Sequence, residues 1–199
     1  AWDSYKILDQ EISEDQEDHR WKGHLAFVPQ EGFIISANFR DNVVFDYGTS
    51  PQLDPRVFES LAATEFRLDV ERIEKGLETE IGERGVNLSG GQKQRISLAR
   101  VDYNSANILL LDDCLSALDV DTESRIVDQL LCDRWKNSTR ILVTHRLSVL
   151  EKSDRIIFLD QGQIAEEGSY QDLLERSTAF REFTQSVHHE ITKDIDVEV

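Results

Sequence analysis

The stretch Leu88-Ser89-Gly90-Gly91-Gln92, followed directly by Lys93-Gln94-Arg95-Ile96-Ser97-Leu98-Ala99-Arg100, decides the fold of this chain. A serine and two glycines leave the backbone bare where a helix begins, so several amide groups and the positive end of the helix dipole face outward together. The residues after Gln92 are polar, with Ile96 and Ala99 on one side, which predicts a helix. Ser-Gly-Gly alone is more often an ordinary turn, but at a helix start it favours an anion site.

A mainly apolar run at residues 107–111 follows this helix and ends in two carboxylates, Asp112 and Asp113. Such a run is typical of a strand that is buried on both faces of a parallel sheet. Acidic side chains at the carboxyl end of such a strand lie where open α/β sheets bind their ligands. The two stretches together therefore predict an α/β fold with a ligand site at this edge of the sheet.

These motifs resemble those of the ATP-binding cassette (ABC) superfamily, whose signature reads LSGGQ and whose Walker B strand follows it. Further matches come in the family's order: Gln30 after Pro29 resembles the Q-loop, residues 116–119 resemble the D-loop, and the Thr-His-Arg at residues 144–146 resembles the switch-histidine loop. The resemblance covers roughly residues 25–183. It implies an α/β, P-loop NTPase-like cassette with a mainly parallel sheet core and a helical subdomain.

The resemblance also divides the chain into segments. We expect a truncated N-terminal segment at 1–20, the core strand and Q-loop at 21–37, the helical subdomain ending in the signature at 38–91, the α/β core with Walker B, D-loop and switch histidine at 92–183, and a polar C-terminal tail at 184–199.

The sequence contains no Gly-x-x-x-x-Gly-Lys-Ser/Thr stretch. The Walker A loop, whose amides and lysine hold phosphates, is therefore expected to be missing from this chain.

The local patterns predict several individual elements. Strands are expected at Leu25–Val28 and Thr139–Thr144, helices at Asp54–Leu68 and Asp121–Leu131, and a hairpin over 155–166 that turns at Gln161-Gly162, followed by a capping box at Ser169–Asp172. Trp2, Tyr5, Ile7 and Leu8 fit one face of a short helix, which we expect to be the tail of the helix after Walker A. After Phe183 the chain is polar, so we expect a linker or a frayed end.

The resemblance assigns catalytic and metal-binding roles to the motif residues. Asp112 and Gln30 are expected to hold Mg²⁺, since this ion prefers oxygen ligands and keeps much of its hydration. Asp113 stands where the family usually has a glutamate that positions or deprotonates the attacking water, and its shorter side chain could misplace that water. His145 is expected to interact with a γ-phosphate as donor or relay. Gln30, Asp113 and His145 form the expected catalytic set.

A second set of residues is expected to contact ATP: Leu88, Ser89, Gly90, Gly91, Gln92 and Asp119. In the family, the signature closes over ATP held by the Walker A loop of a partner cassette, in a head-to-tail pair. The resemblance thus implies ATP and Mg²⁺ as cofactors, and a second nucleotide-binding domain and transmembrane domains as partners. The loop at residues 79–85 resembles that of exporters, and the Asp-Asp pair is typical of the first cassette in the multidrug-resistance-associated branch.

Bulk composition agrees with these expectations. The net charge of -17 and a pI near 4.6 argue against nucleic acid as a partner, because that affinity depends mainly on Lys and Arg. No stretch approaches the roughly 20 apolar residues of a membrane span. We therefore expect a location on the cytoplasmic side of a membrane, with attachment through the transmembrane domains.

The expected function is that of a fragment of an ABC transporter's nucleotide-binding domain, which couples ATP binding and hydrolysis to transport. ATPase activity is expected of the intact dimeric protein and not of this chain alone. Two alternatives stay open. One is a catalytically degenerate, regulatory cassette that binds or clamps ATP without efficient hydrolysis, as Asp113 suggests. The other is a soluble, non-transport ABC ATPase, which the exporter-like loop and the missing coiled-coil insertion disfavour.

Overall fold

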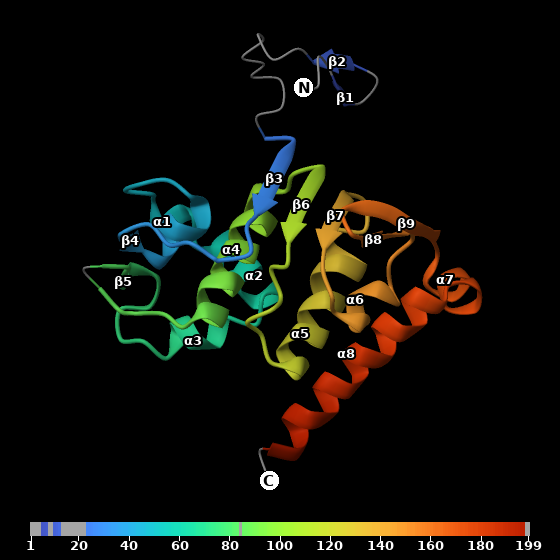
Figure 1. The fold of residues 1–199 in the computed structure, drawn as a ribbon. Coiled ribbons are helices and arrows are strands. Elements are labelled where there is room, and N and C mark those ends of the chain that lie inside the picture. Colours follow the sequence, from blue (N-terminus) through green and yellow to red (C-terminus); the bar gives the residue numbers. More distant parts are fainter. Residues whose placement is uncertain (1–4, 8–9, 13–22, 84, 198–199) are drawn as a thin grey trace.

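The computed structural model describes residues 5–7, 10–12, 23–83 and 85–197. Three parallel strands form its central sheet, in the order β3 (Leu25–Val28), β6 (Ile108–Asp112) and β7 (Thr139–Val143) (Figure 1). The register places Val28 opposite Leu111, although they are 83 residues apart along the chain. The predicted α/β fold and all three predicted strands are confirmed.

A helical region lies between β3 and β6 in the sequence. Its elements are α1 (Phe39–Val44), the short 3-10 helix η2 (Pro51–Leu53), α2 (Asp54–Ala63), α3 (Arg67–Glu71), the 3-10 helix η3 (Gly76–Glu78) and α4 (Gly90–Asn104). Two short antiparallel strands, β4 (Ala37–Asn38) and β5 (Glu80–Ile81), join its two sides. The predicted exporter-like loop at residues 79–85 therefore contains a strand.

The single helix expected over Asp54–Leu68 is wrong, because the chain breaks it into α2 and α3. Glu65 adopts a left-handed conformation with φ of 55°, which an α-helix cannot contain. The amide of Phe66 then donates to the carbonyl of Leu61 at 2.8 Å, as in a helix C-cap. This turn buries the Phe66 ring, which is 1% exposed, in the core of the helical region.

The helix expected over Asp121–Leu131 is also modified. The α-helix α5 (Val120–Ile126) continues as a π-helix, η4 (Val127–Arg134), whose wider turns follow an i to i+5 pattern. The amide of Trp135 donates to the carbonyl of Leu130 at 2.8 Å, five residues earlier. The Trp135 indole donates to the buried carboxylate of Asp102 at 3.1 Å, so a contact distant in sequence stabilises this end.

The C-terminal part contains α6 (Leu147–Leu150), β8 (Ile156–Asp160), β9 (Gln163–Gly168), α7 (Tyr170–Arg176) and α8 (Thr178–Val197). The predicted hairpin is confirmed, and its turn residues Gln161 and Gly162 have φ of 46° and 76°, as a type I′ turn requires. The predicted capping box of Ser169 and Asp172 is confirmed as well.

The linker or frayed end expected after Phe183 is wrong. Helix α8 runs on to Val197 and crosses the lower part of the molecule in Figure 1. Phe180, Thr184 and Val187 recur at helical spacing and are all buried, at 0%, 5% and 8% exposure.

The helix expected near the N-terminus is wrong for the residues that can be compared. Tyr5–Ile7 and Gln10–Ile12 form two antiparallel strands, β1 and β2, with Tyr5 opposite Ile12. Tyr5 and Ile7 belong to the aromatic and β-branched residue types that are enriched in strands. Trp2 and Leu8 lie outside the described residues.

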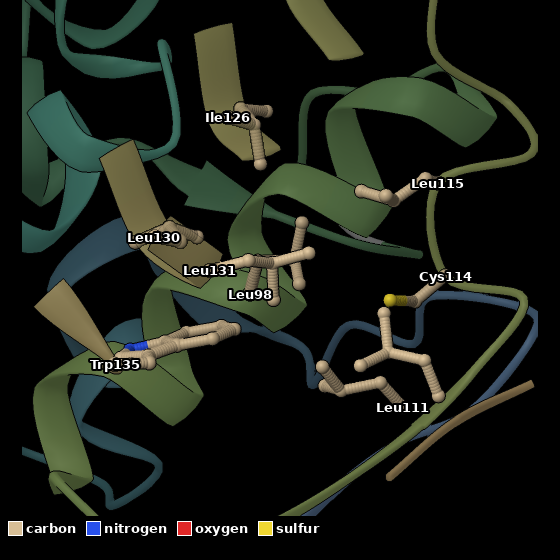
Figure 2. A pocket seen from close by; sticks show the side chains of 9 residues that line it. Leu98, Leu111, Cys114, Leu115, Ile126, Leu130, Leu131 and Trp135 are labelled. Carbon is tan, nitrogen blue, oxygen red and sulfur yellow. The ribbon is translucent and has the colours of Figure 1, made fainter. Parts of the chain in front are cut away.

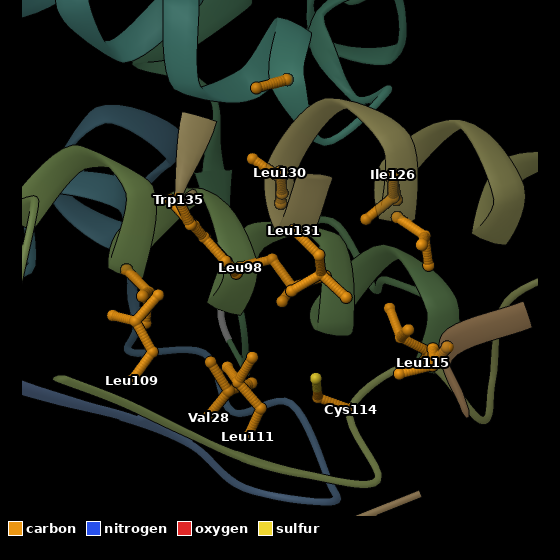
Figure 3. Packing of buried hydrophobic residues seen from close by; sticks show 14 of the residues in the cluster. Val28, Leu98, Leu109, Leu111, Cys114, Leu115, Ile126, Leu130, Leu131 and Trp135 are labelled. Carbon is orange, nitrogen blue, oxygen red and sulfur yellow. The ribbon is translucent and has the colours of Figure 1, made fainter. Parts of the chain in front are cut away.

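One helix, α4, divides two hydrophobic cores. Its Leu98 and Val101 pack with Val28, Leu109 and the aliphatic residues of α5 and η4, in the cluster that Figure 3 shows. On another side of the same helix, Ile96 and Ala99 pack into the helical region, and their common side is the one that the sequence predicts. The beginning of α4, which is the predicted signature, is thereby fixed against both halves of the fold.

The opposite face of the central sheet is open to solvent within the described residues. Leu25, Phe27, Ile141 and Val143 are exposed by 39%, 55%, 55% and 62%. The register places them on the face opposite Val28, because successive side chains alternate along each strand. The expectation of strands that are buried on both faces is therefore wrong for this face.

Candidate functional site

Three of the predicted site residues follow three neighbouring strands. Gln30 comes after β3, Asp113 after β6 and His145 after β7. Because the strands are parallel, their carboxyl ends meet at one edge, where ligands of open α/β sheets bind. The amide of Asp113 donates to the carbonyl of Val143 at 2.8 Å, which ties the loop after β6 to the end of β7.

Asp113 and His145 face each other at this edge. His145 Nδ1 lies 3.3 Å from Asp113 Oδ1. The Asp113 side chain is 15% exposed, and its Oδ1 makes no hydrogen bond to any residue that the structure describes. Its φ of 42° is unusual for a residue other than glycine. A residue with a strained backbone and an under-bonded carboxylate is common at functional sites.

Asp112 is the last residue of β6 and is half-buried. Within the described residues, no group of three or more His, Cys, Asp or Glu side chains could hold a metal ion alone. Mg²⁺ does not need such a group, since it commonly takes one or two carboxylates and completes its shell with water and phosphate oxygens. One carboxylate at the sheet edge therefore fits Mg²⁺ that arrives with a nucleotide. The Gln30 side chain is exposed beside this edge.

The signature segment, residues 88–92, forms a capping box at the start of α4. The Ser89 hydroxyl accepts a hydrogen bond from the Gln92 amide at 3.2 Å, and Gln92 Oε1 accepts one from the Ser89 amide at 2.9 Å. Leu88 packs against the core of the helical region, whereas Ser89 and Gly90 are exposed. The segment thus has a fixed conformation and a free surface.

The loop after β6 lies against the two glycines of this segment. A Cβ on Gly91 would lie 2.7 Å from the carbonyl oxygen of Ala117, which is closer than real Cβ atoms come. A Cβ on Gly90 would meet only the Ala117 methyl, at an ordinary 3.6 Å. Gly91 is therefore required for this close approach, while Gly90 is not.

Asp119 is exposed and caps the start of α5. Its Oδ1 accepts a hydrogen bond from the Thr122 amide at 2.9 Å. This hydrogen bond holds the pKa of Asp119 below its usual value, because it stabilises the charged carboxylate. The side chain that the sequence predicts as an ATP contact therefore has a structural role in the chain itself.

The predicted site residues fall into two groups. Gln30, Asp112, Asp113 and His145 form a sheet-edge group, and the signature segment with Asp119 forms a second group. Among the residues that the structure describes, no hydrogen bond or ion pair joins a signature residue directly to the sheet-edge side chains. The sequence predicts both groups, but it does not predict what connects them.

Gln94 connects the two groups, and the sequence analysis did not predict this role. Its side chain is 3% exposed, donates to the carbonyl of Gln30 at 2.8 Å and accepts from the amide of Ala117 at 3.1 Å. The sequence does contain a sign of this role. Gln94 precedes the buried Leu98 and Val101 by four and seven residues, so it lies on the same buried face of the helix. A polar residue on a buried helix face must find hydrogen-bond partners.

Arg146 is the second connection that was missed. Its Nη2 donates to the carbonyl of Ser116 at 2.8 Å, and its Nη1 lies 3.0 Å from the carboxylate of Glu123. The Glu123 side chain, on α5, is only 5% exposed. The sequence gives no local sign of this pair, since 23 residues separate its members.

A small apolar cavity lies behind the loop after β6 (Figure 2). Its volume of about 10 Å³ is at the lower limit for a single water molecule. Cys114 lines it, and burial raises the pKa of this thiol to about 12, so the thiol stays neutral. The cavity is a packing gap of the core and is far too small for a nucleotide.

The described helices include none that combines the length and the apolar character of a membrane span.

Comparisons with known proteins support the motif reading. The family described as "ABC transporter" matches residues 3–116. The chain is 42% identical over 163 residues to the probable multidrug resistance ABC transporter ATP-binding/permease protein YheI of Bacillus subtilis. It is 43% identical over 164 residues to ATP-binding cassette sub-family C member 3 of Homo sapiens. The alignments cover 82% and 81% of this chain but only 27% and 10% of those proteins.

A solved structure is similar to this fold. It is the structure of a bacterial Atm1-family ABC exporter with ATP bound, with a TM-score of 0.79 and 33% sequence identity. The match covers 90% of this chain and 31% of that one. The predicted resemblance to exporter-type cassettes is confirmed by these relatives.

Proposed function

Because the chain belongs to the ABC transporter family, we propose that it serves in the nucleotide-binding domain of an exporter and contributes two separate surfaces to shared ATP sites. The observation that supports this most is the division of the site residues into two groups. A signature that is exposed, capped and not bonded directly to the sheet-edge side chains can contact a nucleotide that another cassette holds.

In this proposal the signature segment binds the phosphate end of ATP held by a partner cassette. Ser89 and Gly90 are exposed at the positive end of α4, where backbone amides and the helix dipole favour an anion. The capping box fixes the conformation of Ser89 before any ligand arrives. Binding then costs little additional ordering.

The sheet-edge group would act on a second nucleotide. Asp112 would hold Mg²⁺, which when bound neutralises charge on the phosphates, and Gln30 would approach the same ion. Asp113 would orient the attacking water through its carboxylate, which is 15% exposed, and the half-exposed His145 would contact the γ-phosphate. Each role requires only positioning and electrostatics, as phosphoryl transfer generally does.

The open sheet face supports the further proposal that the chain is a fragment of the cassette. Leu25, Phe27, Ile141 and Val143 form an apolar surface on strands whose other face is well packed. A sheet of this kind in an α/β fold normally has helices on both faces. We propose that a segment with a phosphate-binding loop covers this face, and we retain the predicted division of the chain at residues 20, 37, 91 and 183.

The proposed setting is the cytoplasmic side of a membrane, next to transmembrane domains and a second nucleotide-binding domain. Relatives such as the ATP-binding/permease protein YheI are several times longer than this chain, so the membrane part would lie outside it. The ATP-driven movement of a substrate is thus a property that we propose for the intact protein.

A regulatory cassette is the second candidate function, and the geometry of Asp113 favours it. The short carboxylate lies 3.3 Å from His145, so it is held toward the protein. Asp113→Glu in the intact protein separates the two candidates. A clear rise in ATP turnover indicates a hydrolytic site that the aspartate weakens, whereas unchanged turnover indicates a site that binds ATP without efficient hydrolysis.

The main proposal is tested by Ser89→Phe in the intact protein. The bulky ring occupies the exposed surface of the signature, so ATP-driven transport should fall strongly, and by much more than the loss of the cap, about 1 kcal/mol, explains. Ser169→Phe, at the capping box of α7, is the matched control, because it alters a cap outside both groups. Normal transport by Ser89→Phe would count against the proposal.

A further inference from the structure

One peptide unit, the bond between Ser116 and Ala117, is held at both of its ends. Its N–H, on Ala117, donates to Gln94 Oε1 at 3.1 Å. Its C=O, on Ser116, accepts from Arg146 Nη2 at 2.8 Å. The two side chains come from α4 and from the loop after β7, so distant elements meet on one rigid plane.

Gln94 connects this peptide unit to the loop after β3. The same side-chain amide that accepts from Ala117 donates to the carbonyl of Gln30 at 2.8 Å. Gln94 is 3% exposed, so water cannot replace either hydrogen bond easily. Gly32 adds a close contact, since a Cβ there would lie 2.6 Å from the backbone nitrogen of Gln94.

Arg146 connects the same peptide unit to α5 and to the backbone around His145. The Arg146 guanidinium forms an ion pair with Glu123 at 3.0 Å, and the Arg146 amide donates to the Thr144 hydroxyl at 3.1 Å. These bonds fix the backbone on both sides of His145. Arg146 Nε is buried and makes no hydrogen bond to any described residue, so most of this guanidinium's bonding depends on Ser116 and Glu123.

We propose that the Ser116–Ala117 peptide unit couples the loops after β3, β6 and β7, with Gln94 and Arg146 as its positioning residues. A peptide plane cannot turn at its N–H end without turning at its C=O end. A shift of Gln30 would move Gln94, tilt this plane and weaken the bond to Arg146, which adjoins His145. The role of this coupling in an ATP site rests on the proposed function, but the coupling itself does not.

The test measures hydrogen exchange of the Ala117 amide by NMR in the 199-residue chain, without nucleotide. Gln94→Leu removes the direct acceptor and should speed exchange about tenfold, the effect of one lost hydrogen bond. Arg146→Gln does not touch this amide, yet it should also speed its exchange several-fold, because the plane loses its other anchor. Arg155→Gln, which breaks a surface ion pair with Glu167, is the matched control and should change nothing at Ala117.

Two further variants keep the test decisive. Arg146→Lys retains a donor for the Ser116 carbonyl and should restore most of the protection, which also covers the case in which Arg146→Gln fails to fold. The double variant Gln94→Leu/Arg146→Gln should exchange no faster than about the faster single variant, because both act on one plane.

Unchanged Ala117 exchange in Arg146→Gln, or effects that multiply in the double variant, would overturn the coupling. Since no nucleotide or partner is present, that result would leave the proposed ATP site untouched. Conversely, a chain that shows the coupling but never contacts ATP would refute only the proposed function.

Discussion

The start of α4 and the end of β6 are both predicted parts of an ATP site, but their local bonding is opposite. At the start of α4, Ser89 and Gln92 satisfy each other's backbone amides, and both residues have ordinary conformations. At the end of β6, Asp113 has a positive φ and a buried oxygen without a hydrogen bond in the described part of the chain. The hydrogen bonds of the α4 cap are therefore complete within the chain, whereas the Asp113 carboxylate lacks one.

This difference indicates which of the two regions adds to the stability of the chain without a ligand and which reduces it. A complete cap stabilises the helix whether or not a ligand is present, so the signature conformation is built into the fold. An under-bonded carboxylate costs stability, and the surrounding structure must hold it in place. We therefore expect substitutions of the capping residues at the α4 start to destabilise the chain, and substitutions at Asp113 to affect function with little loss of stability.

Gly91→Ala should have the largest effect on stability. The new Cβ would lie 2.7 Å from the Ala117 carbonyl oxygen, so backbone must shift, at a cost of about 2 kcal/mol in the free energy of unfolding. Urea denaturation measures this change. Gly90→Ala is the matched control and should be close to wild type, since its Cβ meets only a methyl group at 3.6 Å. Equal stability of the two variants would contradict the close approach of the loop.

Ser89→Ala should destabilise the chain by about 1 kcal/mol, the usual effect of losing an N-cap. Ser169→Ala removes the cap of the other capping box, at α7, and should cost a similar amount in the same denaturation experiment. In the intact protein, only Ser89→Ala should also weaken ATP-dependent activity. A functional loss that is equal in both variants would mean that stability alone explains it.

Asp113→Asn should leave the free energy of unfolding within about 0.5 kcal/mol of wild type, or raise it. Asparagine tolerates the positive φ, and it removes a buried, under-bonded charge. ATP turnover by the intact protein should nevertheless fall. Thermal and urea denaturation check the first statement, and a loss of more than about 1 kcal/mol would show that Asp113 is structural.

Asp119 should give the smallest effect, and one that depends on pH. Its pKa is lowered in the folded chain, so its carboxylate adds stability above the unfolded-state value near pH 4, and this stability is lost as the pH falls through the folded-state pKa. Asp119→Asn should therefore reduce stability by roughly 0.3 kcal/mol at pH 6, because solvent screens an exposed cap, and by less at pH 3. Denaturation of both proteins at the two pH values measures the difference, and a penalty that grows at pH 3 would reverse the assigned sign.

Local patterns predict much of this fold from sequence. The helix after Gln92, the strand before Asp112 and the Gln161-Gly162 turn each follow from residues within a few positions of one another. The positions of Gln30, Asp113 and His145 at one edge follow from the parallel order of three strands. These elements also contain the motifs, so most residues of the candidate site could be predicted from the sequence.

Contacts between distant residues account for what the sequence does not predict. The break at Glu65 serves the burial of Phe66, and the π-helix ends where Trp135 reaches Asp102, 33 residues away. The bonds of Gln94 to Gln30 and Ala117 likewise join segments 64 and 23 residues apart. No window of local sequence contains such pairs, although a polar residue on a buried helix face hints at them.

The most direct test of the central proposal is an equilibrium titration of the folded 199-residue chain with Mg·ATP, with circular dichroism to verify folding. If the chain offers a signature surface and a sheet edge but no phosphate-binding loop, no saturable binding should occur up to about 1 mM ATP. Saturable binding with a Kd of about 10 μM or below would contradict the proposal, since it would mean that the chain alone forms a complete nucleotide site.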